Sequence, residues 1–151
     1  MRGQKRVNNV GTDGRVSVIY YKNLVWAAWK GAGDDGIWYA TMDISDVNKD
    51  NNFGPQTKID GVGTKVGPTM CLYKGVLYLF WTGSGDTNCW YTWWNDGAQE
   101  FEPQTKIVVP DNLAIGSTAG PTAVETPAGV LLLAWNGSTD KTLWWSFAHL
   151  G

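Results

Sequence analysis

The apolar residues of this chain fall in short runs that are separated by clusters of glycine, asparagine and aspartate. Three of these runs, at 24–29, 76–81 and 130–135, are continuous stretches of apolar residues. A continuous run of this length between turn residues is typical of a strand that is buried on both faces. No segment shows the 3.6-residue periodicity of an amphipathic helix, so the pattern predicts an all-β fold.

Each apolar run lies between two further predicted strands. One strand precedes the run and is joined to it by a tight turn. At these turns Asn23, Gly75 and Gly129 supply the positive φ that hairpins need. A strand dense in Trp, Tyr and Phe follows it. The predicted first strands are 16–21, 69–73 and 122–126, and the predicted third strands are 37–42, 89–94 and 143–148.

The loop after each apolar run is an internal repeat. Its three copies read Trp29-Lys-Gly-Ala-Gly-Asp-Asp-Gly-Ile-Trp38, Trp81-Thr-Gly-Ser-Gly-Asp-Thr-Asn-Cys-Trp90 and Trp135-Asn-Gly-Ser-Thr-Asp-Lys-Thr-Leu-Trp144. In each copy a glycine follows the first tryptophan by two positions, an aspartate by five and a second tryptophan by nine. The copies are roughly 50 residues apart, which is a period typical of repeat architectures. They leave no room for a second domain.

A Pro-Gln-Thr-Lys-Ile motif at 55–59 and at 103–107 predicts a fourth strand on a sheet edge, where proline is tolerated. The third copy ends before such a motif, but residues 4–12 at the N-terminus align with residues 56–64. The chain therefore opens with a fourth strand and closes one strand short. We divide it into a closing strand and loop (1–14), unit 1 (15–66), unit 2 (67–119) and unit 3 (120–151).

The repeated loop is similar to a shortened Asp box, with Ser84 and Ser138 two positions before the aspartate and Ala32 in the first copy. On this loop and the offset closing strand, the chain resembles the sialidase-like and tachylectin-like propeller lectins. The resemblance implies a β-propeller with four-stranded blades and carbohydrate binding. Here the loop follows the second strand, whereas an Asp box usually follows the third.

Three blades are too few to close a ring, because propellers typically have four to eight. We therefore predict a homodimer that forms one six-bladed β-propeller, in which each N-terminal strand completes the last blade of the partner. Such closure removes the open sheet edge at the C-terminus. The alternative is a monomer with internal threefold symmetry, a β-trefoil or a β-prism.

A sugar packs its C–H faces on an aromatic ring and directs its hydroxyls to carboxylates or amides, in a pocket with a few convergent polar groups. In a propeller, the loops between strands two and three share a rim with the connections between blades. We therefore predict a lectin that binds neutral glycans at repeated rim sites and needs no cofactor. The predicted ligand-binding residues are Trp29, Asp34, Asp35, Trp81, Asp86, Trp135, Asn136 and Asp140. The second tryptophans of the loops, Trp38, Trp90 and Trp144, are assigned to the core.

The same residues also have purely structural explanations. A tryptophan at a strand end often only packs one sheet on the next, and an aspartate in a glycine-rich loop often bonds to its own turn. The alternative to a lectin is therefore a ligand-free assembly module, natural or engineered, whose repeats serve packing alone. A calcium site is disfavoured because each loop offers few of the six to eight oxygens that calcium takes.

Composition and charge exclude other classes of function. The formal net charge is -2, which offers no attraction for nucleic acid. No run of 18 apolar residues predicts membrane insertion, and no signal-peptide pattern opens the chain, so we expect a soluble protein. No enzymatic site is expected, because the arginines lie in the N-terminal arm and the one histidine, His149, lies near the other end. We expect Cys71 and Cys89 to be free and buried, since a strand separates them.

Overall fold

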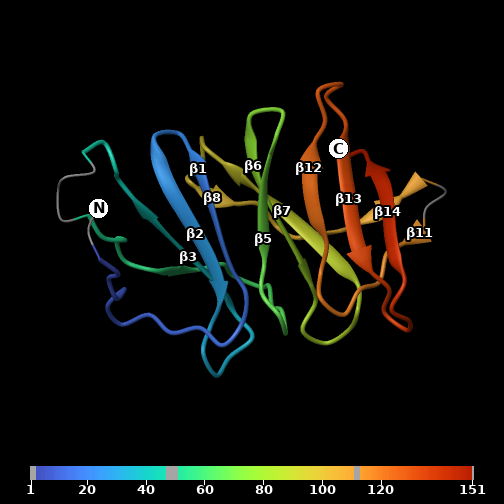
Figure 1. The fold of residues 1–151 in the computed structure, drawn as a ribbon, viewed down its shortest axis with the longest axis horizontal. Helices are drawn as coiled ribbons and strands as arrows, with labels where there is room; N and C mark the ends of the chain where they lie inside the picture. The colour runs from blue at the N-terminus through green and yellow to red at the C-terminus, as the bar shows by residue number, and fades with distance from the viewer. Residues whose placement is uncertain (1–2, 47–50, 111–112, 151) are drawn as a thin grey trace.

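The computed structural model describes residues 3–46, 51–110 and 113–150, and within these ranges the chain forms fourteen strands and no α-helix. The all-β prediction is therefore confirmed. Figure 1 shows three antiparallel sheets side by side in chain order, one for each predicted unit. Among the described residues, no helix is long and apolar enough to cross a membrane.

Each sheet is a meander whose neighbouring strands follow one another in sequence, except that the last short strand of unit 2 pairs with the third strand of its sheet. Unit 1 contains β1 (Val16–Tyr21), β2 (Leu24–Lys30), β3 (Ile37–Met42) and β4 (Thr57–Lys58). Unit 2 contains β5 (Thr69–Tyr73), β6 (Val76–Thr82), β7 (Cys89–Asn95), β8 (Glu100–Phe101) and β9 (Thr105–Lys106). Unit 3 contains β12 (Thr122–Glu125), β13 (Leu131–Asn136) and β14 (Leu143–Ala148).

The predicted strands agree with the observed ones to within a residue at most ends. The Pro-Gln-Thr-Lys-Ile motif supplies β4 and β9, which pair with β3 and β7 respectively. Two features were not predicted. Strand β8 is a second partner of β7, and β10 (Val108–Val109) pairs with β11 (Leu113–Ala114) in the connection between units 2 and 3.

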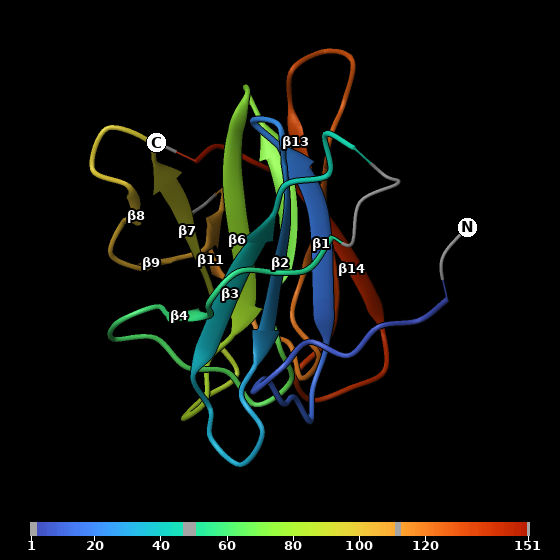
Figure 2. The same cartoon turned by 90° about the vertical axis from the view of Figure 1, so that its left-hand side faces the viewer.

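The three sheets pack face to face, with their first strands adjacent to one another. Strand β5 contacts both β1 and β12, and the end-on view in Figure 2 shows the sheets stacked behind one another. Side chains join these first strands. The Met70 N–H donates to Ser17 Oγ at 3.0 Å, and Thr69 Oγ1 donates to the Pro121 carbonyl at 2.8 Å.

The core lies between the sheets rather than within one of them. Ala28, Ile37, Leu79 and Trp81 are buried between units 1 and 2. Phe80, Cys89, Leu131 and Leu133 are buried between units 2 and 3. Burial of this apolar area is the main favourable term for the stack. Cys71 and Cys89 are free and buried, as predicted, because β6 separates their strands.

The two ends of the stack expose large apolar side chains. At the unit 1 end, Val16, Val18 and Tyr20 of β1 are about half or more exposed. At the unit 3 end, the exposed side chains are those of Val124, Leu143, Trp145 and Phe147.

Candidate functional site

The loop between the second and third strands has the same internal bonding in every unit. The glycine N–H donates to the carbonyl five residues later at 3.0 Å, and the aspartate Oδ1 accepts the backbone N–H two residues later at 2.7–3.0 Å. This is an Asx turn, which the side chains of aspartate and asparagine favour. The three hydrogen-bonded pairs of donor glycine and acceptor carbonyl are Gly31–Gly36, Gly83–Asn88 and Gly137–Thr142. The three aspartates are Asp34, Asp86 and Asp140.

The glycine of each loop lies directly beneath the aspartate. A Cβ added to Gly83 would stand 2.7 Å from Asp86 Oδ1 and 3.0 Å from Trp90 Nε1. The same crowding is found at Gly137, where Asp140 and the Nε1 of Trp144 approach. A residue without a side chain is needed where other groups approach the backbone this closely. The repeated spacing of Trp, Gly, Asp and Trp therefore brings the carboxylate and the second indole together.

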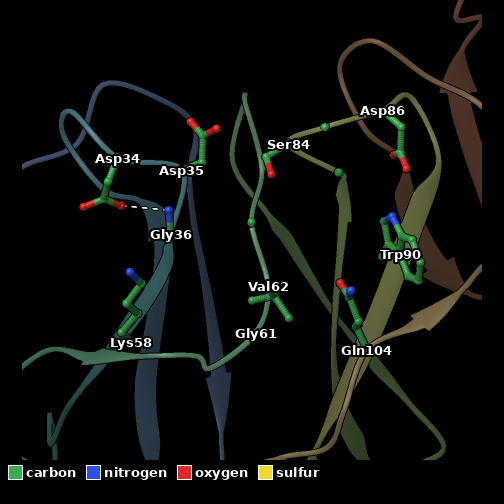
Figure 3. A pocket seen from close by; sticks show the side chains of 13 residues that line it. Asp34, Asp35, Gly36, Lys58, Gly61, Val62, Ser84, Asp86, Trp90 and Gln104 are labelled. Carbon is green, nitrogen blue, oxygen red and sulfur yellow. Dashed lines mark hydrogen bonds between the residues drawn. The ribbon is translucent and has the colours of Figure 1, made fainter.

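A cavity of about 510 Å³ lies between units 1 and 2. Figure 3 shows Asp34 and Asp35 from the unit 1 loop on one side and Asp86 with Trp90 from unit 2 on the other. Lys58 lies in the fourth strand of unit 1, and Gln104 lies just before the fourth strand of unit 2. The connection 61–63 lies between these two residues. The volume lies in the range of small-molecule pockets, and its wall combines one aromatic ring with several polar groups.

Equivalent pockets lie at the loops of the other two units. The unit 1 pocket has a volume of about 140 Å³ and contains Asp34, Trp38 and Gln56. The unit 3 pocket has a volume of about 380 Å³ and contains Asp140 and Trp144. A glycine of the preceding connection lines each pocket, and these glycines are Gly11, Gly63 and Gly116. The site is therefore a repeated feature of the fold.

Two of the three tryptophans that were predicted to bind a ligand are buried in the core instead. Trp29 and Trp81 are only 4 % and 0 % exposed, so they do not offer a ring face to a ligand. Trp135 is half-buried and lines the unit 3 pocket. Trp38, Trp90 and Trp144, which were expected in the core, each line a pocket.

The position of each strand in its sheet explains this difference. The first tryptophan lies on a central strand. Unit 1 covers Trp81, whereas Val10 and Phe53 pack against the cluster that contains Trp29. The second lies on a third strand, whose outer neighbour is only two residues long in units 1 and 2. In units 1 and 2 the ring on the third strand therefore keeps part of its surface open, whereas the ring on the central strand does not.

The predicted polar residues have different positions. Asp34, Asp35 and Asp86 line the pocket between units 1 and 2, and Asp140 lines the unit 3 pocket. Asp35 also pairs with Lys65 at 2.8 Å. Asn136 corrects the prediction, because it does not line the unit 3 pocket. Its Oδ1 accepts from Ser117 Oγ at 2.7 Å and its Nδ2 donates to Thr118 Oγ1 at 2.6 Å, so it holds the connection before β12.

The Pro-Gln-Thr-Lys-Ile motif contributes residues that were not predicted to belong to the site. Gln56 and Gln104 line pockets, and Lys58 and Lys106 lie over tryptophan rings. The Nζ of Lys58 is 5.7 Å from the ring centroid of Trp38, a cation–π distance. The repeated Pro-Gln-Thr-Lys-Ile motif was the signal for these residues. A polar motif that recurs beside the same loop indicates a role at that loop in addition to strand pairing.

Among the described residues, no group of three or more His, Cys, Asp or Glu side chains is placed to hold a metal ion. No protein-family model matches the chain, and no curated protein is similar to it in sequence. The resemblance to propeller lectins therefore stays a prediction from the repeated loop.

Proposed function

We propose that this chain is a carbohydrate-binding protein that holds neutral glycans in the repeated pockets beside its Asp loops. The observation that carries the proposal is the pairing of a half-open indole ring with a carboxylate on the wall of one pocket, as Trp90 and Asp86 are paired. The same pairing recurs at Trp38 with Asp34 and at Trp144 with Asp140.

The chemistry of the pocket suits an uncharged polyhydroxyl ligand. A pyranose ring offers C–H groups to the indole face and O–H donors to the carboxylates of Asp34 and Asp86. A carboxylate oxygen has two lone pairs, so it can accept from a ligand while it braces its own turn. Gln104 and Lys58 supply donors for hydroxyl oxygens. Three carboxylates around one cavity repel acidic sugars, which favours neutral ones.

The assembly that we propose is a homodimeric, six-bladed β-propeller in which each unit is one blade. Three meander sheets that stack face to face with adjacent first strands support this arrangement over a trefoil or prism monomer. A ring that carries the site several times would bind a multivalent glycan surface far more tightly than a single sugar.

The exposed ends of the stack are the two halves of one blade interface. Val18 and Tyr20 align with Met70 and Leu72, which pack against unit 1. At the other end, Leu143, Trp145 and Phe147 align with Cys89, Tyr91 and Trp93, which pack against unit 3. A second copy therefore offers each exposed end the surface that its equivalents already contact inside the chain.

The test is a titration with methyl glycosides of glucose, galactose, mannose, fucose and N-acetylglucosamine, followed by the NMR shifts of the loop glycines. At least one glycoside should shift Gly63 and Gly83 with a Kd between millimolar and high micromolar, or about -4 to -6 kcal/mol. Trp90→Ala should abolish that response, whereas Trp94→Phe, on the same strand but outside this pocket, should keep it. A folded, assembled protein that gives no shift and no signal on a glycan array would favour the ligand-free assembly module.

A further inference from the structure

In the part of the chain that the structure describes, unit 3 has the loop of the site without a fourth strand beside it. In unit 1, β4 places Lys58 opposite Trp38, and in unit 2, β9 places Lys106 opposite Trp90. In both units the lysine Nζ lies over the ring, at 5.7 and 5.5 Å from its centroid. Among the described residues no strand pairs with the outer edge of β14, and Trp144 and Trp145 are 49 % and 61 % exposed.

The N-terminal segment has the sequence of the missing strand. Gln4-Lys5-Arg6-Val7 aligns with Gln56-Thr57-Lys58-Ile59 and with Gln104-Thr105-Lys106-Ile107. The alignment places a glutamine at the pocket position and a cation at the position over the tryptophan. Arg6 is thus the equivalent of Lys58 and Lys106.

The connection that follows this segment already has the conformation of its equivalent between units 1 and 2. Asn9 has a φ of 59°, and the aligned Gly61 has a φ of 71°. Thr12 Oγ1 accepts the N–H of Gly14 at 3.2 Å, just as Thr64 Oγ1 accepts the N–H two residues later at 3.3 Å. The loop half of the N-terminal copy is therefore formed, and residues 3–7 form no strand.

The position of this connection excludes pairing of residues 4–7 with β14 of the same chain. The Ala32 N–H donates to the Gly11 carbonyl at 3.2 Å and the Arg15 N–H to the Val66 carbonyl at 2.7 Å, so the connection is fixed to unit 1. Figure 1 shows the N-terminus and β14 at opposite ends of the stack. Four residues span at most about 14 Å, so the segment reaches only a sheet that packs against the outer face of unit 1.

We propose that residues 4–7 of a second copy of this chain pair with β14 and complete the unit 3 pocket as a composite site. One copy supplies Asp140 and Trp144, and its partner supplies Gln4 and Arg6. By the register of the other units, Arg6 lies opposite Trp144 and Lys5 opposite Trp145. In a twofold dimer the contact occurs twice, once at each junction. The assignment of a ligand to this pocket rests on the proposed function, but the pairing does not.

Disulfide trapping tests the pairing directly. Opposite residues in an antiparallel pair have Cα atoms about 4.5–5.5 Å apart, which a disulfide can span. The Lys5→Cys and Trp145→Cys chains are purified separately and mixed under mild oxidation. They should give a cross-linked species of two chains, which a reductant separates into single chains. Neither variant alone should give it. Lys5→Cys mixed with Phe147→Cys is the matched control, because that register is out by two residues and should cross-link several-fold more slowly.

A second measurement addresses the pocket. Gln4→Ala and Arg6→Ala should weaken glycoside binding at the unit 3 loop, seen at Gly137, by roughly tenfold, and leave binding at Gly83 unchanged. Absence of the Lys5–Trp145 cross-link in folded protein, or a link within one chain, would overturn the composite site. A cross-link without any glycoside response would retain the shared strand and reject the glycan-binding proposal.

Discussion

Trp81 and Trp90 are direct partners across β6 and β7, yet one belongs to the core and the other to the pocket. Trp81 is fully buried among Ala28, Ile37 and Leu79 between units 1 and 2. Trp90 is half-buried and lies beside Asp86. Trp29 and Trp38 are paired and divided in the same way in unit 1. Units 1 and 2 thus use one cross-strand pair for two purposes.

Truncation of the two tryptophans should separate these purposes. Trp81→Ala removes a buried ring from the interface between units 1 and 2, so the free energy of unfolding should fall by about 3–5 kcal/mol. Trp90→Ala should lower it by clearly less, because the ring is part-exposed, while binding at that pocket is lost. Urea denaturation with an unchanged m-value is the measurement. Equal losses of stability would contradict the division.

Gly83→Ala should disturb the site through the backbone. Its new Cβ would stand 2.7 Å from Asp86 Oδ1, so the carboxylate must leave the Asx turn or the loop must shift. We expect a loss of roughly 1–3 kcal/mol in stability, as for other overpacked positions, and a loss of binding at the unit 1–unit 2 pocket. Gly85→Ala is the matched control in the same loop. Its Cβ would have no heavy atom within 4 Å, so its stability should be close to that of the natural chain.

The strands could be predicted from sequence because their signals are local. The positive φ of Asn23, Gly75 and Gly129 lies at the hairpin turns, and the apolar runs between turns gave the central strands. The Asx turn of the repeated loop is local as well, since the aspartate bonds to a backbone N–H two residues away. These features need no knowledge of how the sheets pack.

The solvent exposure of each tryptophan ring depends on residues that are distant in the sequence, so local patterns could not predict it. Trp81 is buried because Ile37 and Ile59 of unit 1 cover it. The side-chain amide of Asn136 forms hydrogen bonds with Ser117 and Thr118, which belong to a connection almost twenty residues earlier. A pattern of spacings identifies the residues that recur, but the neighbouring sheet decides which of them faces a ligand.

The Cys89 thiol should make the stability fall in alkaline solution. Burial raises the pKa of Cys89 from its usual 9.0 to about 11, so the folded state holds the proton longer than the unfolded state. The stabilisation is fully present below pH 9 and is lost as the pH rises toward 11, by about 2–3 kcal/mol. Unfolding measured at pH 8 and pH 11 in the natural chain and in Cys89→Ala should show the steeper fall in the natural chain. Parallel curves would mean that the thiol ionises as easily when folded.

The mass of the assembled protein tests the ring itself. Light scattering at micromolar concentration should give twice the 16.6 kDa of one chain, because in the proposed dimer the exposed ends of units 1 and 3 cover each other. Deletion of residues 1–12 removes the shared strand and should expose the outer edge of β14, so the truncated chain should aggregate. Replacement of residues 4–7 by Gly-Ser-Gly-Ser keeps the chain length and removes the strand-forming side chains, and it should have the same effect. A stable monomer of the natural chain would contradict the ring, and a truncated chain that remains a soluble dimer would show that the N-terminal strand does not close it.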